Sequence, residues 1–302
     1  MPTFENFQES QVTKAIILGH TGAGKTGALA SLAAAGYNVR ILDLDKGVEI
    51  LKDYVLNPQS IYTKANPGHW TQDDCRDIAK RITYVTITEK MSIKAGRAIP
   101  RADGWKRVND QLDHWRDGET DLGNIGTWGP KDVLVIDTLS RASSMAFNFI
   151  LAMNGRLLVR PEQSDWGQGQ KLVEDLLTML YSDEVKCNVI VNAHISYIET
   201  EAGPTRGFAQ TLGKALSPKV GQYFNHALMA KTTGQGEAQK RVIVTNTSGI
   251  IELKNPAPLR VKPEYPLETG LADYFRDVRV ASPVPAKAAQ APVPAIVIGD
   301  KP

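Results

Sequence analysis

The chain has 302 residues, of which 42% are hydrophobic and 23% charged, a composition that is ordinary for a globular protein and argues against wholesale disorder. Its formal net charge of +2 shows no electrostatic footprint of a dedicated duplex-binding protein, although a local basic groove can exist within a balanced total. The charge therefore neither indicates nor excludes a nucleic-acid partner. The length suits one large α/β domain with a full core, and we expect one domain rather than two.

Cysteine usage and the amino terminus favour a cytoplasmic protein. Cys75 and Cys187 are isolated from each other, so we expect neither a disulfide framework nor a zinc site, and both should be structural. Residues 1–14 are polar and include Glu5 and Glu9, which is unlike a signal peptide. No apolar run approaches the roughly 18 residues that a membrane-spanning helix needs, so we expect no membrane association.

The chain begins with a strand, a glycine-rich loop and a helix. Residues 15–18 form an apolar run, residues 26–35 are a helical stretch of small residues, and Gly36 is a candidate carboxyl cap. Residues 39–44 are typical of a second buried strand. A strand, helix and strand within about 30 residues make one βαβ unit, which predicts a parallel sheet covered by helices.

Strands and helices continue to alternate along the chain. The predicted strands lie at residues 82–87, 133–136 and 189–191. The predicted helices lie at residues 105–115, 141–153 and 170–181. This alternation predicts a doubly wound sheet.

The pattern changes after Gly207. A helix is expected near residues 218–224, and residues 241–245 and 249–253 are typical of an antiparallel hairpin that extends one edge of the sheet. Residues 281–302 are rich in Ala and Pro, so we expect a disordered tail. Its apolar patch at residues 295–298 is either a docking peptide or part of an inert tail.

The loop from residue 19 to residue 26 reads GHTGAGKT and fits the pattern G-x-x-x-x-G-K-[ST]. Glycines allow backbone N–H groups to converge on phosphate oxygens, Lys25 is placed to reach the β and γ phosphates, and Thr26 can offer its hydroxyl to Mg²⁺. A glycine-rich turn that only joins strand to helix is the alternative, but such a turn has no use for Lys-Thr at the helix start. We therefore predict that ATP and Mg²⁺ bind here. The cradle comprises Gly19, His20, Thr21, Gly22, Ala23, Gly24, Lys25 and Thr26.

The strand at residues 133–136 is followed by Asp137, where a P-loop protein holds its second magnesium anchor. The alternative is that Asp137 caps a helix that begins near Ser140. The glycine-rich loop upstream favours the metal role, so Thr26 and Asp137 are the predicted Mg²⁺ ligands.

Hydrolysis also needs a group that orients or deprotonates the attacking water. Asp43 and Asp45 end the second strand; Asp45 is the first candidate and Glu49 the second, and a surface-turn role is the alternative.

His194 follows the strand at residues 189–191 and is placed to sense the γ phosphate from the carboxyl edge of the sheet. Asn192 is a second candidate for this role. A hydrogen-bonded histidine with no catalytic role is the alternative, because no metal partner of His194 is visible at a ligand spacing. The predicted catalytic residues are Lys25, Asp45, Asp137 and His194.

With these motifs placed, the chain resembles the RecA-like P-loop ATPases, and more closely the compact phage proteins of that fold related to single-strand annealing proteins. The resemblance runs from about residue 14 to residue 280. It rests on GHTGAGKT at 19–26, ILDLD at 41–45, VLVIDTLS at 133–140, SDWGQG at 164–169 and VIVNAH at 189–194. It implies a mostly parallel twisted sheet flanked by helices, with an antiparallel edge hairpin near the C-terminus. One domain would span residues 1–280, with a core at about 12–255.

The resemblance also implies a function. It implies ATP, Mg²⁺, homo-oligomerisation on single-stranded DNA, action beside a single-strand binding protein, and the host cytoplasm if the chain is phage-encoded. Asp45 occupies the position where the family usually places its catalytic glutamate. Because the aspartate is one methylene shorter, the rate of hydrolysis stays open.

DNA contact would come from loops after the third and fourth core strands, here residues 154–169 and 196–214. The basic and aromatic residues in these loops are Arg156, Arg160, Trp166, Arg206, Phe208 and Lys214. Such a mixture suits single strands, because the backbone is charged and bases stack on rings. Four acidic residues lie in the same loops, and Trp166 is equally well a core residue. Lys214 and Lys219 are the candidates for a cation that acts on a neighbouring subunit.

A second basic stretch contains Lys90, Lys94, Arg97, Arg101, Lys106 and Arg107. It either lines a DNA groove or is neutralised on a solvated surface by the acidic residues at 110–121, and the sequence favours neutralisation.

The leading hypothesis is a Mg²⁺-dependent RecA-like ATPase that acts in phage DNA recombination or single-strand annealing. The alternatives are a small-molecule kinase that uses the same loop, and a nucleotide-gated packaging or motor ATPase.

Overall fold

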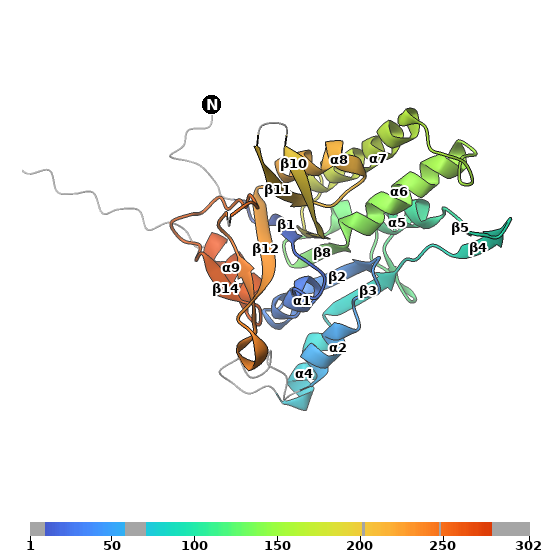
Figure 1. The fold of residues 1–302 in the computed structure, drawn as a ribbon. Helices are drawn as coiled ribbons and strands as arrows, with labels where there is room; N and C mark the ends of the chain where they lie inside the picture. The colour runs from blue at the N-terminus through green and yellow to red at the C-terminus, as the bar shows by residue number, and fades with distance from the viewer. Residues whose placement is uncertain (1–9, 58–70, 201–202, 248, 280–302) are drawn as a thin grey trace, which may run out of the picture.

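The computed structural model describes residues 10–57, 71–200, 203–247 and 249–279. Their main feature is an eight-stranded sheet with the strand order β14-β13-β12-β1-β9-β8-β2-β3 (Figure 1). The strands from β12 to β3 are parallel to one another, whereas β13 is antiparallel to β12 and β14 is antiparallel to β13. The strands are β1 (Lys14–Leu18), β2 (Asn38–Asp43), β3 (Ile82–Thr86), β8 (Asp132–Asp137), β9 (Asn188–Ala193), β12 (His226–Thr233), β13 (Lys240–Val244) and β14 (Glu264–Pro266). This confirms the predicted mostly parallel α/β sheet with antiparallel pairing near the C-terminus.

Helices cover both faces of the sheet (Figure 1). One face carries α1 (Lys25–Ala34), α2 (Ile50–Leu56), α4 (Gln72–Ala79) and α9 (Gly270–Arg279). The opposite face carries α5 (Gly104–Asp113), α6 (Leu139–Met153), α7 (Gln163–Tyr181), the short α8 (Gly213–Leu216) and the 3-10 helix η3 (Ser217–Tyr223).

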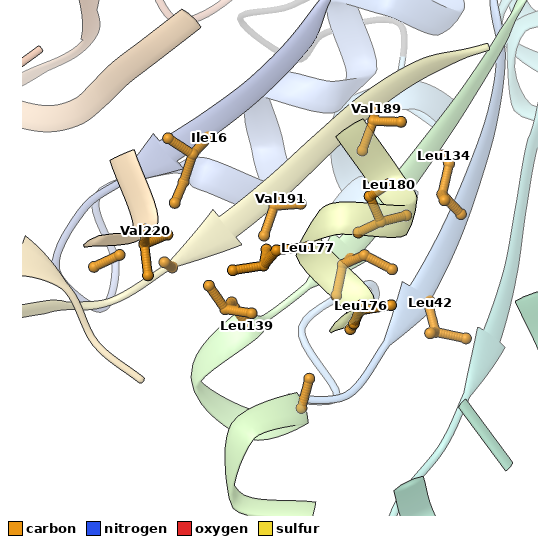
Figure 2. Packing of buried hydrophobic residues seen from close by; sticks show 14 of the residues in the cluster. Ile16, Leu42, Leu134, Leu139, Leu176, Leu177, Leu180, Val189, Val191 and Val220 are labelled. Carbon is orange, nitrogen blue, oxygen red and sulfur yellow. The ribbon is translucent and has the colours of Figure 1, made fainter. Parts of the chain in front are cut away.

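Each central strand contributes to two hydrophobic cores, because successive side chains of a strand point to opposite faces. On β8, Val135 packs in the cluster beneath α1, whereas its neighbour Leu134 packs in the cluster beneath α7. Figure 2 shows the second cluster, in which Leu177 of α7 lies close to Val191 of β9. Burial on both faces explains why these strands are continuous apolar runs in the sequence.

Most predicted elements are confirmed, with shifted ends. The strands expected at 82–87, 133–136 and 189–191 are β3, β8 and β9. The helices expected at 105–115 and 141–153 are α5 and α6, but α7 begins seven residues earlier than its predicted start at Gln170. Its early start has a local cause, because the Asp165 carboxylate accepts a hydrogen bond from the backbone N–H of Glu162 at 2.8 Å. Part of the predicted DNA-contacting loop at 154–169 is therefore helical.

The predicted hairpin of residues 241–245 and 249–253 is wrong in its partner. Residues 241–244 lie in β13, which pairs on one side with β12 and on the other with β14. In the described part of this region, Ile251 makes only an isolated bridge to Gly207. The connection between β12 and β13 begins at Gly234, whose φ is 79°. A Cβ there would lie 2.4 Å from the carbonyl oxygen of Ala238, so this turn requires glycine.

Two larger hairpins project from the core. The strands β4 (Met91–Lys94) and β5 (Arg97–Pro100) form the first, and β10 (Ile195–Thr200) and β11 (Gly203–Ala209) form the second. Ala95 and Gly96 at the first turn have φ values of 50° and 73°, as a two-residue type I′ turn requires. Smaller elements are β6 (Arg116–Asp117), β7 (Thr120–Asp121), η2 (Ile125–Thr127) and η4 (Gly236–Ala238).

The tail predicted at residues 281–302 and its apolar patch lie outside the described residues. Within the described ranges, no helix combines the length and the apolar character that crossing a membrane would require.

Candidate functional site

The glycine-rich loop joins the end of β1 to the start of α1, as the sequence predicts. Gly24 has a φ of 100° and directly precedes the helix. A Cβ on Gly19 would lie 2.7 Å from the carbonyl oxygen of Ala230, so the loop passes too close to β12 for a larger residue. The loop thus places backbone N–H groups at a helix N-terminus, which is a favourable site for phosphate.

Lys25 is buried at the first position of α1, with 7% of its surface exposed. Its Nζ donates hydrogen bonds to the carbonyl oxygens of Gly19 at 2.7 Å and His20 at 3.1 Å. Burial lowers the pKa of the Lys25 ammonium, while the carboxylates of Asp137 and Asp45 raise it. The ammonium is therefore held inside the loop and faces two carboxylates.

Thr26 and Asp137 meet at the start of α1. The Thr26 hydroxyl donates a hydrogen bond to the Asp137 carboxylate at 2.6 Å. Asp137 ends β8 and is 3% exposed, and burial raises its pKa, against the hydrogen bond from Thr26 and the charge of Lys25. The alternative capping role is not what Asp137 does, because Thr138 occupies the N-cap of α6.

Asn192 lies on the strand next to Asp137. It lies opposite Asp137 in the register of β8 and β9, and it favours the charged form of that carboxylate. Its side chain is fully buried, and its interaction with the Asp137 carboxylate offsets part of the cost of burying the amide.

The residues present fit Mg²⁺. A hydroxyl from Thr26 and a carboxylate from Asp137 are the hard oxygen donors that this ion prefers. The described residues hold no group of three or more His, Cys, Asp or Glu side chains that would bind a metal by themselves. Mg²⁺ is commonly bound through one or two protein oxygens together with substrate phosphates, which matches this sparse donor set.

Asp45 lies just beyond β2 and has three side-chain partners. Its carboxylate accepts hydrogen bonds from Thr138 Oγ1 at 3.0 Å and from Arg141 Nε at 2.8 Å, and His194 Nε2 lies 3.3 Å away. The structure therefore brings the predicted catalytic residues Asp45 and His194 together.

The other acidic candidates lie elsewhere. Asp43 is 1% exposed and binds the backbone N–H of Gly47 and the Thr86 hydroxyl, which is a structural role. Glu49 lines a separate cavity beside α2 and β3. Of these three acidic candidates, Asp45 is the one that contacts His194.

A cavity of about 470 Å³ joins these residues. It is lined by Lys25, Thr26, Asp45, Asp137 and His194, and by residues that the sequence did not single out. The additional side chains are Ile50, Tyr54, Thr138, Arg141 and Arg241.

Arg141 lies four residues after Asp137, and Tyr54 lies on the helix that follows Asp45. Their closeness in sequence to predicted site residues is a signal that could have identified both. Arg241 lacks such a signal, because it reaches the loop only through the pairing of β12 with β13.

Arg241 holds the tip of the phosphate loop. Its Nε donates a hydrogen bond to the carbonyl oxygen of Gly22 at 3.0 Å. Within the described ranges, no carboxylate forms an ion pair with it, so its other N–H groups are not committed to an acidic partner. Leu267 packs beside it against Gly24, where a Cβ would approach both side chains to 3.0 Å or less.

The predicted DNA-contacting residues do not form a single site. Arg156 is paired with Glu162 at 2.8 Å and with the buried Asp165 at 3.0 Å, so it stabilises the start of α7. Trp166 packs against Phe147, with their ring centroids 4.3 Å apart. Arg160 is exposed in the loop between α6 and α7.

The remaining candidates lie on and after the β10–β11 hairpin. Arg206 is ion-paired with Glu252, Phe208 is half-buried on β11, and Lys214 is exposed on α8. This hairpin contacts the phosphate loop, because Tyr197 Oη lies 3.0 Å from Nε2 of His20. The two rings are stacked with centroids 5.8 Å apart.

Comparisons with known proteins match residues 12–256 to the AAA domain family. The fold is similar to the crystal structure of the RadB recombinase, with 14% identity and a TM-score of 0.43, over 86% of this chain and 90% of that chain. It is also similar to a KaiC-like protein from the hyperthermophilic archaeon Pyrococcus horikoshii, with 13% identity and a TM-score of 0.37, over 81% of this chain and 84% of that chain. At these identities and scores, neither likeness identifies a function. No curated protein matches the chain.

Proposed function

We propose, from the premise that the chain belongs to the AAA domain family, that it binds ATP with Mg²⁺ and hydrolyses the γ phosphate. The observation that supports this most directly is the convergence of Lys25, Thr26 and Asp137 on one cavity. These three side chains come from two segments more than 100 residues apart, so their meeting is a property of the fold and not of the loop motif alone.

Each of these side chains has a role in binding. Lys25 would exchange its contacts with Gly19 and His20 for phosphate oxygens, and backbone N–H groups at the start of α1 would hold the rest of the phosphate chain. Thr26 and Asp137 would hold Mg²⁺, which when bound neutralises charge on the phosphates. Tyr54 and Ile50, which also line the cavity, would offer apolar surface to the nucleobase.

Asp45 is the proposed water-orienting base. During hydrolysis the water oxygen forms a bond to the γ phosphorus, the bond to the β–γ bridging oxygen breaks, and a proton of the water passes to the Asp45 carboxylate. The short distances from Asp45 to Thr138, Arg141 and His194 fix the carboxylate in position. This favours the reaction, because the entropy cost of orienting the base is met before the transition state is reached. His194, which lines the cavity, would sense the γ phosphate from the sheet edge, with Asn192 as the second candidate for this role.

Measured ATP turnover with and without Mg²⁺, for the wild-type chain and Lys25→Ala, tests this proposal. We expect turnover that needs Mg²⁺ and that falls at least tenfold in Lys25→Ala. Turnover unchanged by Lys25→Ala would reject it.

We further propose that the chain is a RecA-like ATPase of phage DNA recombination or single-strand annealing that binds single-stranded DNA as a homo-oligomer, beside a single-strand binding protein. The exposed basic residues Lys94 and Arg97 of the β4–β5 hairpin support this use, whereas Arg206 of the β10–β11 hairpin is already ion-paired with Glu252. Stimulation of ATP turnover by single-stranded DNA is the expected result, and no DNA binding at low salt, where phosphate contacts are strongest, would reject it.

A small-molecule kinase is a second candidate, because a further cavity adjoins the nucleotide site. This space of about 420 Å³ is lined by Asp45 and Arg141 and extends to Lys46, Glu89 and Asn148. A hydroxyl acceptor bound there would lie beside the proposed base. ATP turnover that requires a small acceptor and ignores DNA would favour the kinase.

A further inference from the structure

The β4–β5 hairpin carries two exposed basic residues, Lys94 and Arg97, and is flanked by the exposed Lys90 and Arg101. In Figure 1 it lies at one extremity of the molecule, beyond the end of α6. A hydrogen bond joins it to the loop between α6 and α7: Arg97 Nη1 donates to the carbonyl oxygen of Leu158 at 2.9 Å. This hydrogen bond joins two stretches that are 61 residues apart in the sequence. We call them together the hairpin rim: residues 90–101 and 156–160.

Like charges face each other across this hairpin. Lys94 and Arg97 are directly opposite in the strand register. At the base of the hairpin, the Arg101 backbone N–H bonds the carbonyl oxygen of Lys90, so these two cations are also neighbours. Like charges placed opposite on a strand pair are destabilising, and an anion bound between them would remove that cost.

The described residues do not provide such an anion. Across the described ranges, none of the exposed cations Lys90, Lys94, Arg97, Arg101 and Arg160 forms an ion pair with a carboxylate. The neutralisation by residues 110–121 that the sequence favours is therefore not seen as ion pairs. The described ion pairs in that region join Asp113 to His114 and Asp121 to Arg116. The rim is thus positioned for an anion from outside.

The rim also exposes aliphatic side chains. Met91 and Ile93 are 59% and 81% exposed on one face of the hairpin, and Leu158 and Val159 are 41% and 61% exposed on the adjoining loop. Because side chains alternate along a strand, Met91 and Ile93 lie on the face of the hairpin opposite to Lys90 and Lys94. Leu158 adjoins the cations instead, since its carbonyl oxygen accepts the hydrogen bond from Arg97. A ligand that contacts both the cations and Ile93 must therefore be flexible enough to pass around the hairpin. A ligand that matches this rim must present both negative charge and flat apolar surface.

We propose that the hairpin rim binds single-stranded nucleic acid, with its cations on the phosphates and its aliphatic side chains against the bases. A single strand fits better than a duplex, because only unpaired bases expose their apolar faces to side chains such as Ile93. This inference rests on the proposed DNA-dependent function and adds the place of contact. The rim adjoins the nucleotide site through the cavity of about 420 Å³, which reaches from Asp45 and Arg141 to Met91 and Pro100.

Fluorescence anisotropy of labelled oligothymidylate, titrated with the full chain over a range of salt, tests the proposal. The variants are the pair Lys90→Glu with Lys94→Glu, and Ile93→Ser. The control is Lys186→Glu, an exposed lysine that lines a cavity beside Lys14, away from the hairpin. We expect the lysine pair to weaken binding at least tenfold and to lower the salt slope by about 1.4, since each phosphate contact in a single strand contributes about 0.7.

Ile93→Ser should weaken binding severalfold at every salt concentration and leave the slope unchanged, because it removes an apolar contact only. ATP turnover without DNA should stay at the wild-type level in all variants, which shows that they fold. If the wild-type chain binds no oligothymidylate at low salt, the proposed DNA-dependent function fails as well. If the wild-type chain binds and the rim variants bind equally, only the rim is rejected.

Two other results would also reject the rim as a single-strand site. One is equal affinity for a duplex of the same length. The other is an oligomeric state, measured by light scattering, that changes in the rim variants while oligothymidylate binding does not, since the rim would then be a contact between copies of this chain.

Discussion

The Thr26 hydroxyl donates a hydrogen bond to the Asp137 carboxylate at 2.6 Å, and this contact ties the phosphate loop to the central strand β8. The buried position of Asp137 has a cost, because burial raises the pKa of its carboxyl group. A raised pKa in a carboxylic acid means that the folded state disfavours the charged form, so at neutral pH the Asp137 carboxylate lowers the free energy of unfolding. A group that is unfavourable for stability at a buried strand end is typical of a functional site.

Asp137→Asn should therefore separate stability from activity. We expect ATP turnover with Mg²⁺ to fall by about 100-fold, because the amide is a poor Mg²⁺ ligand. The melting temperature of the nucleotide-free protein should rise, by about 2–4 °C for each kcal/mol of relieved burial cost. Turnover assays and thermal melts check both halves.

Asp132→Asn is the matched control at the other end of the same strand. The pKa of Asp132 is lowered, since hydrogen bonds from Arg40, Gly129 and Asn38 outweigh its burial. This variant should melt lower and keep the Mg²⁺ dependence of turnover. An Asp137→Asn protein that melts lower and turns over ATP at the wild-type rate would contradict the metal role.

Asp45 should be needed for the chemical step and much less for binding. Asp45→Asn removes the base but keeps groups that can bond Thr138 and Arg141, so we expect kcat to fall by about 100-fold with little change in the dissociation constant for ATP. Asp45→Glu keeps a carboxylate and should retain turnover within about tenfold of the wild type. Glu49→Gln is the control, because Glu49 lines a different cavity. Loss of turnover in Glu49→Gln together with normal turnover in Asp45→Asn would show that Glu49, and not Asp45, is the base.

The parts of this site that the sequence predicts are those encoded by short, local patterns. The glycine spacing and Lys25-Thr26 place the phosphate loop, and the apolar run before Asp137 places the metal ligand. Asp45 and His194 follow strands that run parallel to β8, and parallel strands end at the same edge of a sheet, so their side chains meet there.

The parts that the sequence does not predict depend on contacts between distant segments. The strand β12 contains Ala, Met and Lys where a strand pattern would favour β-branched residues. Its burial between β1 and β13 decides its conformation. Because the sequence pattern does not reveal β12, it predicts residues 249–253 as the partner of β13 and does not place Arg241 beside the phosphate loop.

Arg241 should contribute to nucleotide affinity. It holds the Gly22 carbonyl and lines the cavity, so it both orders the loop and presents N–H donors to the phosphates. We expect Arg241→Ala to weaken ATP binding by about tenfold, equivalent to about 1.4 kcal/mol, with a smaller effect on kcat. Arg241→Lys should recover part of the affinity, since the charge is kept while the fork geometry is lost.

Lys240→Ala is the control for Arg241→Ala, since Lys240 is exposed on the same strand and does not line the cavity. Isothermal titration calorimetry gives the affinities. Equal ATP affinities of the wild type and Arg241→Ala would show that Arg241 makes no contribution to nucleotide binding.

His226 should make the stability of the protein depend on pH below neutrality. It is buried at the start of β12, where its Nδ1 lies 2.7 Å from the Tyr274 hydroxyl. Burial, with a further contribution from Arg279, lowers its pKa from the ordinary value of 6.5 to about 4. Above pH 6.5 neither the folded nor the unfolded chain binds this proton. As the pH falls from 6.5 to about 4, the unfolded chain takes up a proton that the folded chain does not, so the free energy of unfolding declines.

The decline attributable to His226 is roughly 3 kcal/mol over that window. His226→Asn keeps a hydrogen-bonding side chain and removes the titration, so its free energy of unfolding, measured by urea denaturation, should fall less steeply across the same window than that of the wild type. Asn is itself a buried polar group, so the comparison concerns the slope with pH and not the absolute stability. His114→Asn is the control, because His114 is largely exposed and its replacement should leave the wild-type slope. Identical slopes in wild type and His226→Asn would show that other groups carry the acid sensitivity of the fold.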